Sequence, residues 1–215
     1  MNKILTHIPE YPKTWKLIWA QPAFKKKVVT ALALNMPILF FFPYFFQYIE
    51  KRNGVQLNDI LLNNIPAINL SVFTFIIIWS FALLLFIRAL QDPGIFITFL
   101  FSFFALSMFR IVTIFLFPLQ PPHNIIVLAD PINYFFYGGS VVTKDLFYSG
   151  HTASQFLIFL CLKRRMDKML AAISTIIVAI FLLVQHVHYS IDIIAAPLFA
   201  YISFLVGKYL SRQGK

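Results

Sequence analysis

The sequence of residues 71–87, SVFTFIIIWSFALLLFI, contains no charged side chain and belongs to an apolar run that extends from Ile68 to Leu90. A run of this length matches the roughly 20 apolar residues that an α-helix needs to cross about 30 Å of hydrocarbon. The whole chain has the same character, because it is 60% hydrophobic and only 12% charged, with a mean hydropathy of +0.78. A soluble domain of 215 residues could not bury so much apolar surface in one core. We therefore expect lipid to solvate the chain.

Five apolar runs of this kind are long and one is short. Backbone polar groups in lipid must be paired within the protein, which for such runs means helices rather than alternating barrel strands. The predicted fold class is all-α, a polytopic membrane protein with a bundle of six transmembrane helices. The expected spans are Val28–Tyr48, Ile68–Leu90, Gly94–Phe117, Ser149–Leu162, Met169–Val187 and Ile191–Val206.

The division of the chain follows from these spans. We expect a cytoplasmic or interfacial N-terminal segment at residues 1–27, a six-helix membrane catalytic domain at 28–210 and a cytoplasmic tail at 211–215. The first run is interpreted as a span rather than a cleavable signal, because it follows 27 residues and has no small-residue cleavage pattern after it. The single cysteine, Cys161, excludes an intrachain disulfide.

The basic residues predict the orientation of the spans. With the N-terminus in the cytoplasm, the inner segments carry most of the 18 Lys and Arg residues, including Lys163, Arg164, Arg165 and Lys168. This arrangement follows the positive-inside rule. The net charge of +10 is therefore interpreted as a topology signal and a contact for anionic lipid heads, and a nucleic-acid partner is not expected. The sequence predicts a multi-pass protein of the cell membrane with both termini cytoplasmic.

Two polar segments then fall on the outer side. They are KDLFYSGHT, residues 144–152, and HVHYSID, residues 186–192. Ionisable groups within a membrane are functional candidates by default. At a helical rise of about 1.5 Å per residue, His151, Asp192 and Arg110 lie roughly 18, 24 and 27 Å above the inner boundary. We expect the three side chains to meet at the depth of the lipid phosphates.

The chemistry of the two segments fits that depth. His188 and Asp192 would share one helical face if the helix begins before His188. A carboxylate that orients an imidazole and stabilises its cationic form supports a nucleophilic or basic histidine. His151, which comes from another helix, could then protonate a departing alkoxide as a general acid.

Other residues are candidates for substrate binding. Arg110 offers a planar fork that matches phosphate oxygens. Ser149 is a candidate N-cap, and Gly150 would let backbone N–H groups at the helix start approach a phosphate closely. Asp145 either accepts a bond from Arg110 or caps the loop. Arg110 itself could instead have a structural or snorkelling role.

Several polar residues have a structural interpretation beside the functional one. His186 is expected to be structural, because it points to another part of a helix than His188. Lys144 is interpreted as a solvated loop residue in preference to a phosphate ligand. Tyr189 and Ser190 are expected to position the backbone.

The segments D-L-F-Y-S-G-H-T (145–152) and H-Y-S-I-D (188–192) resemble the two signature segments of the sphingomyelin synthases, a branch of the type-2 phosphatidic acid phosphatase superfamily. Residues 108–122, MFRIVTIFLFPLQPP, also resemble the third-helix motif of that branch, with Arg110 and Thr113 in matching roles. The resemblance implies that His188, oriented by Asp192, attacks the lipid phosphate and forms a phosphohistidine. His151 would protonate the leaving diacylglycerol, and ceramide or water would accept the phosphoryl group. The scheme needs no cofactor and no metal.

The chain departs from the family pattern in two places. Thr143-Lys144 stands where the synthases typically have Cys-Gly, and Leu182 stands where the broader phosphatases carry an Arg. These departures leave the head group and the acceptor open, and with them the choice between transfer and hydrolysis.

The sequence therefore predicts a lipid phosphotransferase or phosphatase that acts on a phospholipid head group at the outer leaflet, with a lipid alcohol or water as acceptor. Two alternatives remain. In the first, His151, His186, His188 and Asp192 bind a divalent metal ion, since histidine and carboxylate suit several such ions. In the second, the protein is a non-catalytic lipid-binding or scramblase-like membrane protein.

Overall fold

A computed structural model describes residues 15–128 and 142–212, and their secondary structure is helical. Within these residues the only strand-like pairing is an isolated bridge between Val55 and Leu119. The all-α prediction is confirmed for the described chain. Its helices are α1 (Trp15–Trp19), α2 (Pro22–Glu50), α3 (Ile60–Asn63), α4 (Ser71–Gln91), α5 (Pro93–Leu116), α7 (Gly150–Cys161), α8 (Arg165–Val184) and α9 (Ser190–Arg212).

Five of these helices, α2, α4, α5, α8 and α9, are long and apolar enough to cross a membrane. The predicted number of six spans is not confirmed. The remaining predicted span corresponds to α7, which has only 12 residues and is therefore about 18 Å long. It starts after the N-cap Ser149 and stops before Lys163, so the polar residues on both sides limit its length.

The long helices turn large apolar side chains away from the protein. Phe40, Val72 and Ile194 are 74%, 68% and 71% exposed. Many other large apolar side chains of these helices are also exposed, which is unfavourable in water and favourable in hydrocarbon. Together with the length of the helices, it suggests a multi-pass membrane protein.

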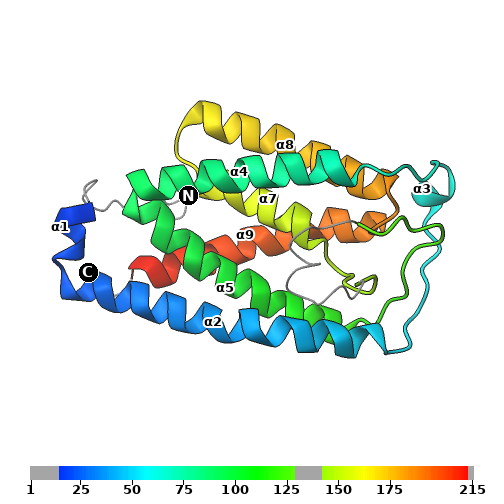
Figure 1. Cartoon of the computed structure of the whole chain (residues 1–215), viewed down its shortest axis with the longest axis horizontal. Coiled ribbons are helices and arrows are strands. Elements are labelled where there is room, and N and C mark those ends of the chain that lie inside the picture. The colour runs from blue at the N-terminus through cyan, green and yellow to red at the C-terminus, as the bar shows by residue number, and fades with distance from the viewer. Residues whose placement is uncertain (1–14, 129–141, 213–215) are drawn as a thin grey trace, which may run out of the picture.

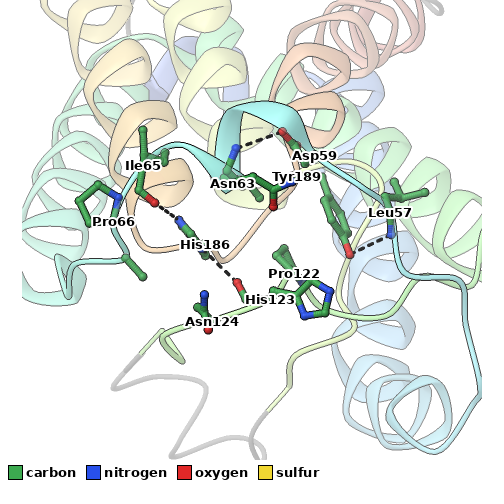
Figure 2. Close-up of a pocket in the computed structure, with 12 residues that line it drawn as sticks. Leu57, Asp59, Asn63, Ile65, Pro66, Pro122, His123, Asn124, His186 and Tyr189 are labelled. Carbon is green, nitrogen blue, oxygen red and sulfur yellow. Dashed lines mark hydrogen bonds between the residues drawn. The ribbon is translucent and has the colours of Figure 1, made fainter.

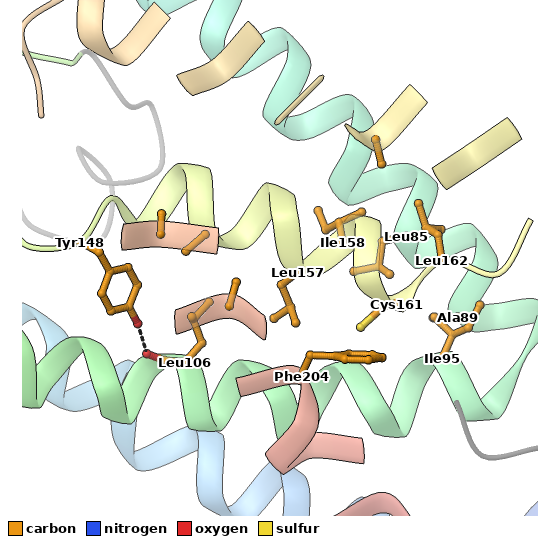
Figure 3. Packing of buried hydrophobic residues seen from close by; sticks show 14 residues of the cluster. Leu85, Ala89, Ile95, Leu106, Tyr148, Leu157, Ile158, Cys161, Leu162 and Phe204 are labelled. Carbon is orange, nitrogen blue, oxygen red and sulfur yellow. Dashed lines mark hydrogen bonds between the residues drawn. The ribbon is translucent and has the colours of Figure 1, made fainter. Parts of the chain in front are cut away.

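Helix α5 lies at the centre of the bundle (Figure 1) and contacts α2, α4, α7 and α9. Its most extensive contact is with α9, where a Cβ on Gly207 would lie 2.6 Å from the Cα of Ser102. Small residues allow such close packing of membrane helices. The largest buried cluster lies where α7 packs beside α5 and α9, and Figure 3 shows its members Leu106, Leu157 and Phe204.

One end of the bundle, which we call the terminal end, contains α1 and the last turn of α9 (Figure 1). Ion pairs join the helices there, with Arg88 Nε 2.6 Å from Asp167 Oδ2 and Lys163 Nζ 2.5 Å from Asp92 Oδ2. Helix α1 packs onto the bundle, since Trp15 Nε1 donates to the carbonyl of Ala89 at 3.3 Å. Of the predicted terminal segments, residues 1–14 and 213–215 lie outside the described residues. The domain division and the sidedness of the termini stay predictions.

At the opposite end, which we call the loop end, the connections at residues 51–70, 117–128, 142–149 and 185–189 meet. The first two pair through their backbones, because Val55 donates to Pro118 and Gln120 donates to Val55, both at 2.9 Å. Gln185 bonds to both of these connections. Its Oε1 accepts from Leu70 N at 3.0 Å, and its backbone carbonyl accepts from Ile126 N at 3.1 Å. The loop end is therefore an interlocked layer above the helices.

Candidate active site

Asp192, in the first turn of α9, bonds to both polar segments of the sequence. Its Oδ2 accepts a hydrogen bond from Tyr189 N at 3.1 Å and lies 3.3 Å from His188 Nδ1. Its Oδ1 accepts from Phe147 N at 3.1 Å, and its carbonyl accepts from Ser149 N at 3.1 Å. The side chain is fully buried. The two segments therefore converge on one carboxylate.

The pairing of His188 with Asp192 arises differently from the prediction. Helix α9 begins at Ser190, so His188 precedes the helix and the two residues do not share a helical face. Tyr189 is the N-cap residue, because its carbonyl accepts from Asp192 N at 3.0 Å. Asp192 is the third helical residue and returns a bond to the N–H of the N-cap, as in a capping box. The capping geometry brings the carboxylate to the histidine.

The His188 side chain is 3% exposed, and its Nδ1 lies within hydrogen-bond distance of the Asp192 carboxylate. When Nδ1 carries the proton and donates it to the carboxylate, the lone pair of the ring lies on Nε2. A carboxylate in this position orients the ring and stabilises its cationic form. The pair therefore has the arrangement that a nucleophilic histidine requires.

Arg110, on α5, contacts the loop that precedes α7. Its Nη1 donates to the carbonyl of Tyr148 at 2.7 Å, and its Nη2 forms an ion pair with Asp145. The guanidinium carbon also lies 5.7 Å from the centre of the Tyr148 ring. Asp145 was considered either a partner of Arg110 or a cap of the loop. The ion pair shows that it is a partner of Arg110.

Gly150 lies directly against this guanidinium. A Cβ at Gly150 would be 2.5 Å from both Cζ and Nη1 of Arg110. The absence of a side chain is thus required by Arg110, whereas the sequence pattern had suggested the approach of a ligand. The predicted N-cap role of Ser149 is confirmed, because its Oγ accepts from Thr152 N at 3.3 Å.

His151 is the second residue of α7, next to Gly150. The centre of its ring lies 5.9 Å from that of Phe75 on α4, in an edge-to-face arrangement. The backbone bond from Ser149 to Asp192 fixes the start of α7 beside the start of α9. All of the predicted site residues therefore belong to, or contact, the segment 145–151 and the first turn of α9.

His186 is turned toward the connections of the loop end (Figure 2). Its Nδ1 and Nε2 lie 3.1 Å from the carbonyl oxygens of His123 and Ile65, respectively. It borders a cavity of about 190 Å³ that is also lined by Asn63 and Asn124. Its contacts agree with the structural interpretation of this residue.

The alternative of a metal site lacks a ligand cluster in the described part of the chain. Among those residues, no three or more His, Cys, Asp or Glu side chains are arranged to hold a metal ion. His186, one of the four proposed ligands, has both ring nitrogens beside backbone carbonyls.

Lys144 and Glu50 bond to each other across the loop end. Lys144 Nζ donates to the carbonyls of Glu50 and Arg52 at 2.8 and 2.6 Å. The Glu50 carboxylate accepts from the backbone N–H groups of Thr143 and Lys144 at 3.0 and 3.1 Å. The prediction of a solvated loop residue is wrong for Lys144, because it is half-buried and its ammonium group bonds to two carbonyls. The segment leading to Asp145 is thus bonded to the end of α2.

Sequence reasoning missed Glu50 and a second acidic residue, Asp59. Both lie near or within the first connection, outside the polar segments, and both accept hydrogen bonds from distant backbone. Only eight acidic residues occur in the chain, and this scarcity is the one signal that could have indicated them.

Comparison with protein families gives one match. Residues 144–209 match the family model described as "PAP2 superfamily C-terminal". The match supports the type-2 phosphatidic acid phosphatase superfamily. It includes both polar segments, and thus His151, His188 and Asp192, but not Arg110. The comparisons with curated proteins and with solved structures found no match. The superfamily suggests phosphatase or phosphotransferase activity on lipid phosphates.

Proposed function

We propose that this protein is an integral-membrane lipid phosphotransferase or phosphatase that works through a phosphohistidine on His188. The observation that carries the proposal is the Asp192 carboxylate, which bonds to His188 and also to the loop that leads into His151. In this proposal the nucleophile His188, the orienting carboxylate of Asp192 and the general acid His151 act on one phosphate. The family match supports activity on lipid phosphates. The resemblance of residues 145–152 and 188–192 to the sphingomyelin synthases supports the transfer variant.

The first half-reaction transfers the phosphoryl group to the protein. His188 Nε2 attacks the phosphorus atom of a phospholipid, so that an N–P bond forms and the P–O bond to diacylglycerol breaks. His151 donates its proton to the departing alkoxide as a general acid. Asp192 stabilises the positive charge that develops on the His188 ring.

The second half-reaction reverses these roles. The hydroxyl group of the acceptor, either water or a lipid alcohol such as ceramide, gives its proton to His151 and attacks the phosphorus atom. The N–P bond breaks, and His188 returns to its initial form. With water as the acceptor, the protein releases phosphate from phosphatidic acid or the phosphorylated head group from phosphatidylcholine. With a lipid alcohol as the acceptor, it is a transferase.

Arg110 and the start of α7 bind the phosphate in this scheme. The guanidinium has five N–H donors. Nη1 bonds to the Tyr148 carbonyl and Nη2 pairs with Asp145, so the remaining N–H groups can bond to phosphate oxygens. The first N–H groups of a helix have no acceptor within it and attract anions. Ser149 and Gly150 place this helix start beside Arg110.

The positive-inside distribution of Lys and Arg supports a site that faces the outer leaflet. The basic cluster at residues 163–168 lies at the terminal end, whereas His151, His188 and Asp192 lie at the loop end. The lipid would then present its phosphate to the loop end from the exoplasmic surface.

The test uses purified protein with phosphatidylcholine, and separately phosphatidic acid, labelled at phosphorus. We expect an acid-labile label on the protein that His188→Ala abolishes. His123→Ala is a matched control, because the His123 ring is exposed and the residue contributes its carbonyl to the fold. Addition of ceramide distinguishes a new phospholipid from released phosphate or head group.

Two results would contradict the proposal. Lipid turnover without any protein-bound label would exclude the phosphohistidine. Lipid binding that survives His188→Ala, with no turnover in the unchanged protein, would favour the lipid-binding alternative.

A further inference from the structure

Asp59, in the first connection of the loop end, accepts hydrogen bonds from two helix starts at once. Its Oδ1 accepts from the N–H groups of Leu61 and Leu62 in α3 at 3.0 and 3.3 Å. The same oxygen accepts from Ser190 Oγ at 3.0 Å, and its Oδ2 accepts from Ser190 N at 2.6 Å. A single carboxylate thus caps α3 and bonds to the first residue of α9, which is 131 positions away in the sequence.

The N-cap residue of α9, Tyr189, offers no capping side chain of its own. Ser, Thr, Asp and Asn are preferred at the N-cap because a short side-chain oxygen can accept from the N–H group of the second or third helical residue. Tyr189 has no such oxygen. Its hydroxyl lies instead at the loop end, where it donates to the Gln120 carbonyl at 2.9 Å and accepts from Leu57 N at 3.2 Å (Figure 2). Asp59 instead bonds from outside the helix to the N–H group of the first helical residue, Ser190, and the first N–H groups of a helix have no acceptor within it.

Two carboxylates therefore bond to the start of α9. Asp59 bonds to Ser190, while Asp192 bonds back to Tyr189 and pairs with His188. Ser190 lies between His188 and Asp192 in the chain, so a shift of its backbone changes their separation. That separation, 3.3 Å between Nδ1 and Oδ2, is already at the long end for a hydrogen bond.

We propose that Asp59 is a positioning residue of the catalytic site: by bonding to the N–H and hydroxyl groups of Ser190, its carboxylate fixes the start of α9 and with it the alignment of His188 on Asp192. This role rests on the proposed function. Asp59 lies outside residues 144–209, so the family match does not include it.

The charge of Asp59 suits this role. An anion at a helix N-terminus is favourable because the helix dipole is positive there. Burial acts to raise the pKa of Asp59, but the hydrogen bonds from Ser190, Leu62 and Leu61 outweigh it and leave the pKa below its ordinary value. The carboxylate is therefore ionised at neutral pH, as acceptance of four hydrogen bonds requires.

The decisive variant is Asp59→Asn. Asparagine caps a helix about as well as aspartate, so α3 can keep its cap. One carboxylate oxygen becomes an NH₂ donor, however, and cannot accept from the Ser190 N–H while the other oxygen caps α3. Asn63→Ala is the matched control, because it removes a bond within the same region, from Asn63 Nδ2 to Asn58 Oδ1, and leaves Ser190 untouched.

Two measurements are made on each purified protein, steady-state lipid turnover and hydrogen exchange at residues 189–193. We expect Asp59→Asn to lower kcat at least about tenfold with KM changed less than about threefold, as for an interaction needed in the transition state only. Exchange at residues 189–193 should accelerate at least about tenfold through local opening of the first turn of α9. Asn63→Ala should change neither quantity by more than about twofold.

An unchanged kcat, or unchanged exchange at residues 189–193, in Asp59→Asn would overturn the proposal. A parallel loss of activity in Asn63→Ala would also overturn it, because the effect would then be general to the α3 region. If the unchanged protein neither turns over lipid nor becomes labelled, the proposed function fails, and the catalytic role of Asp59 fails with it. The exchange data would still decide separately whether Asp59 fixes the start of α9.

Discussion

A Cβ atom on Gly150 would lie 2.5 Å from the guanidinium carbon of Arg110. Gly150→Ala is therefore expected to displace Arg110 from Tyr148 and Asp145, although alanine is otherwise favourable in a helix. We expect kcat/KM for lipid phosphate to fall at least about a hundredfold, since small misplacements of a binding group have effects of this size. Turnover per folded protein is the measurement.

Gly207→Ala is the control for this substitution. Its Cβ would clash with Ser102 where α5 meets α9, and Ser102 lies eight residues, or about two helical turns, before Arg110 on α5. Overpacking of this kind costs about 1–3 kcal/mol of stability. The control should lower the thermal midpoint and keep kcat, and equal activity losses in both variants would argue against a specific contact at Gly150.

Asp192→Asn should damage catalysis far more than lipid binding. The amide keeps nearly the same shape, but it cannot stabilise a cationic His188 as a carboxylate does, and it can select the wrong tautomer of the ring. We expect kcat to fall at least about a thousandfold with little change in KM. Asp167→Asn, which affects an ion pair with Arg88 at the terminal end, is the matched control and should leave kcat near that of the unchanged protein.

Arg110→Lys tests the planar fork. Arginine donates to Tyr148 and pairs with Asp145 at the same time, whereas an ammonium group is a point charge on a flexible stem. We expect kcat/KM to fall by about ten- to a hundredfold, measured with phosphatidic acid and phosphatidylcholine. Arg88→Lys provides the comparison at a structural ion pair, and an equal loss in that variant would contradict a phosphate-binding role for Arg110.

The lowered pKa of Asp59 predicts a dependence of stability on pH. Because its folded-state pKa is below the ordinary 3.8, the unfolded chain binds a proton more readily, so stability rises with pH in this range. The contribution is present above the ordinary value and is lost as pH falls through the folded-state pKa. Thermal unfolding in detergent from about pH 6 to about pH 3 should show this loss. The loss should be smaller in Asp59→Asn, and identical pH profiles would contradict the assignment.

The long helices could be predicted from the sequence because a long apolar segment in lipid can satisfy its backbone hydrogen bonds only as a helix or as part of a closed β-barrel. The span expected at Gly94–Phe117 is observed as Pro93–Leu116. Helix α2, however, begins at Pro22 rather than Val28, because the apolar run starts after Lys27 whereas helical geometry includes the basic turn before it. In the same way, α9 continues past Val206 to Arg212.

The hydrogen bonds that hold the site together were harder to predict from the sequence than the residues that form it. The predicted pairing of His188 with Asp192 is observed, but it does not depend on a shared helical face, since the capping bond from Tyr189 N to Asp192 brings the two residues together. Glu50 and Asp59 were not found at all. Their partners are mainly backbone N–H groups, which every residue except proline carries, so no pattern of residue types records such contacts.

The bonds of Glu50, Asp59 and Arg110 to distant segments have a consequence for any attempt to shorten the chain. A truncated protein made of residues 144–209 would keep His151, His188 and Asp192 yet lose the acceptor of Ser190 N, the acceptor of Lys144 N and the counterion of Asp145. The minimal unit that could work is therefore not the stretch with the recognisable motifs. It must begin early enough to include α2.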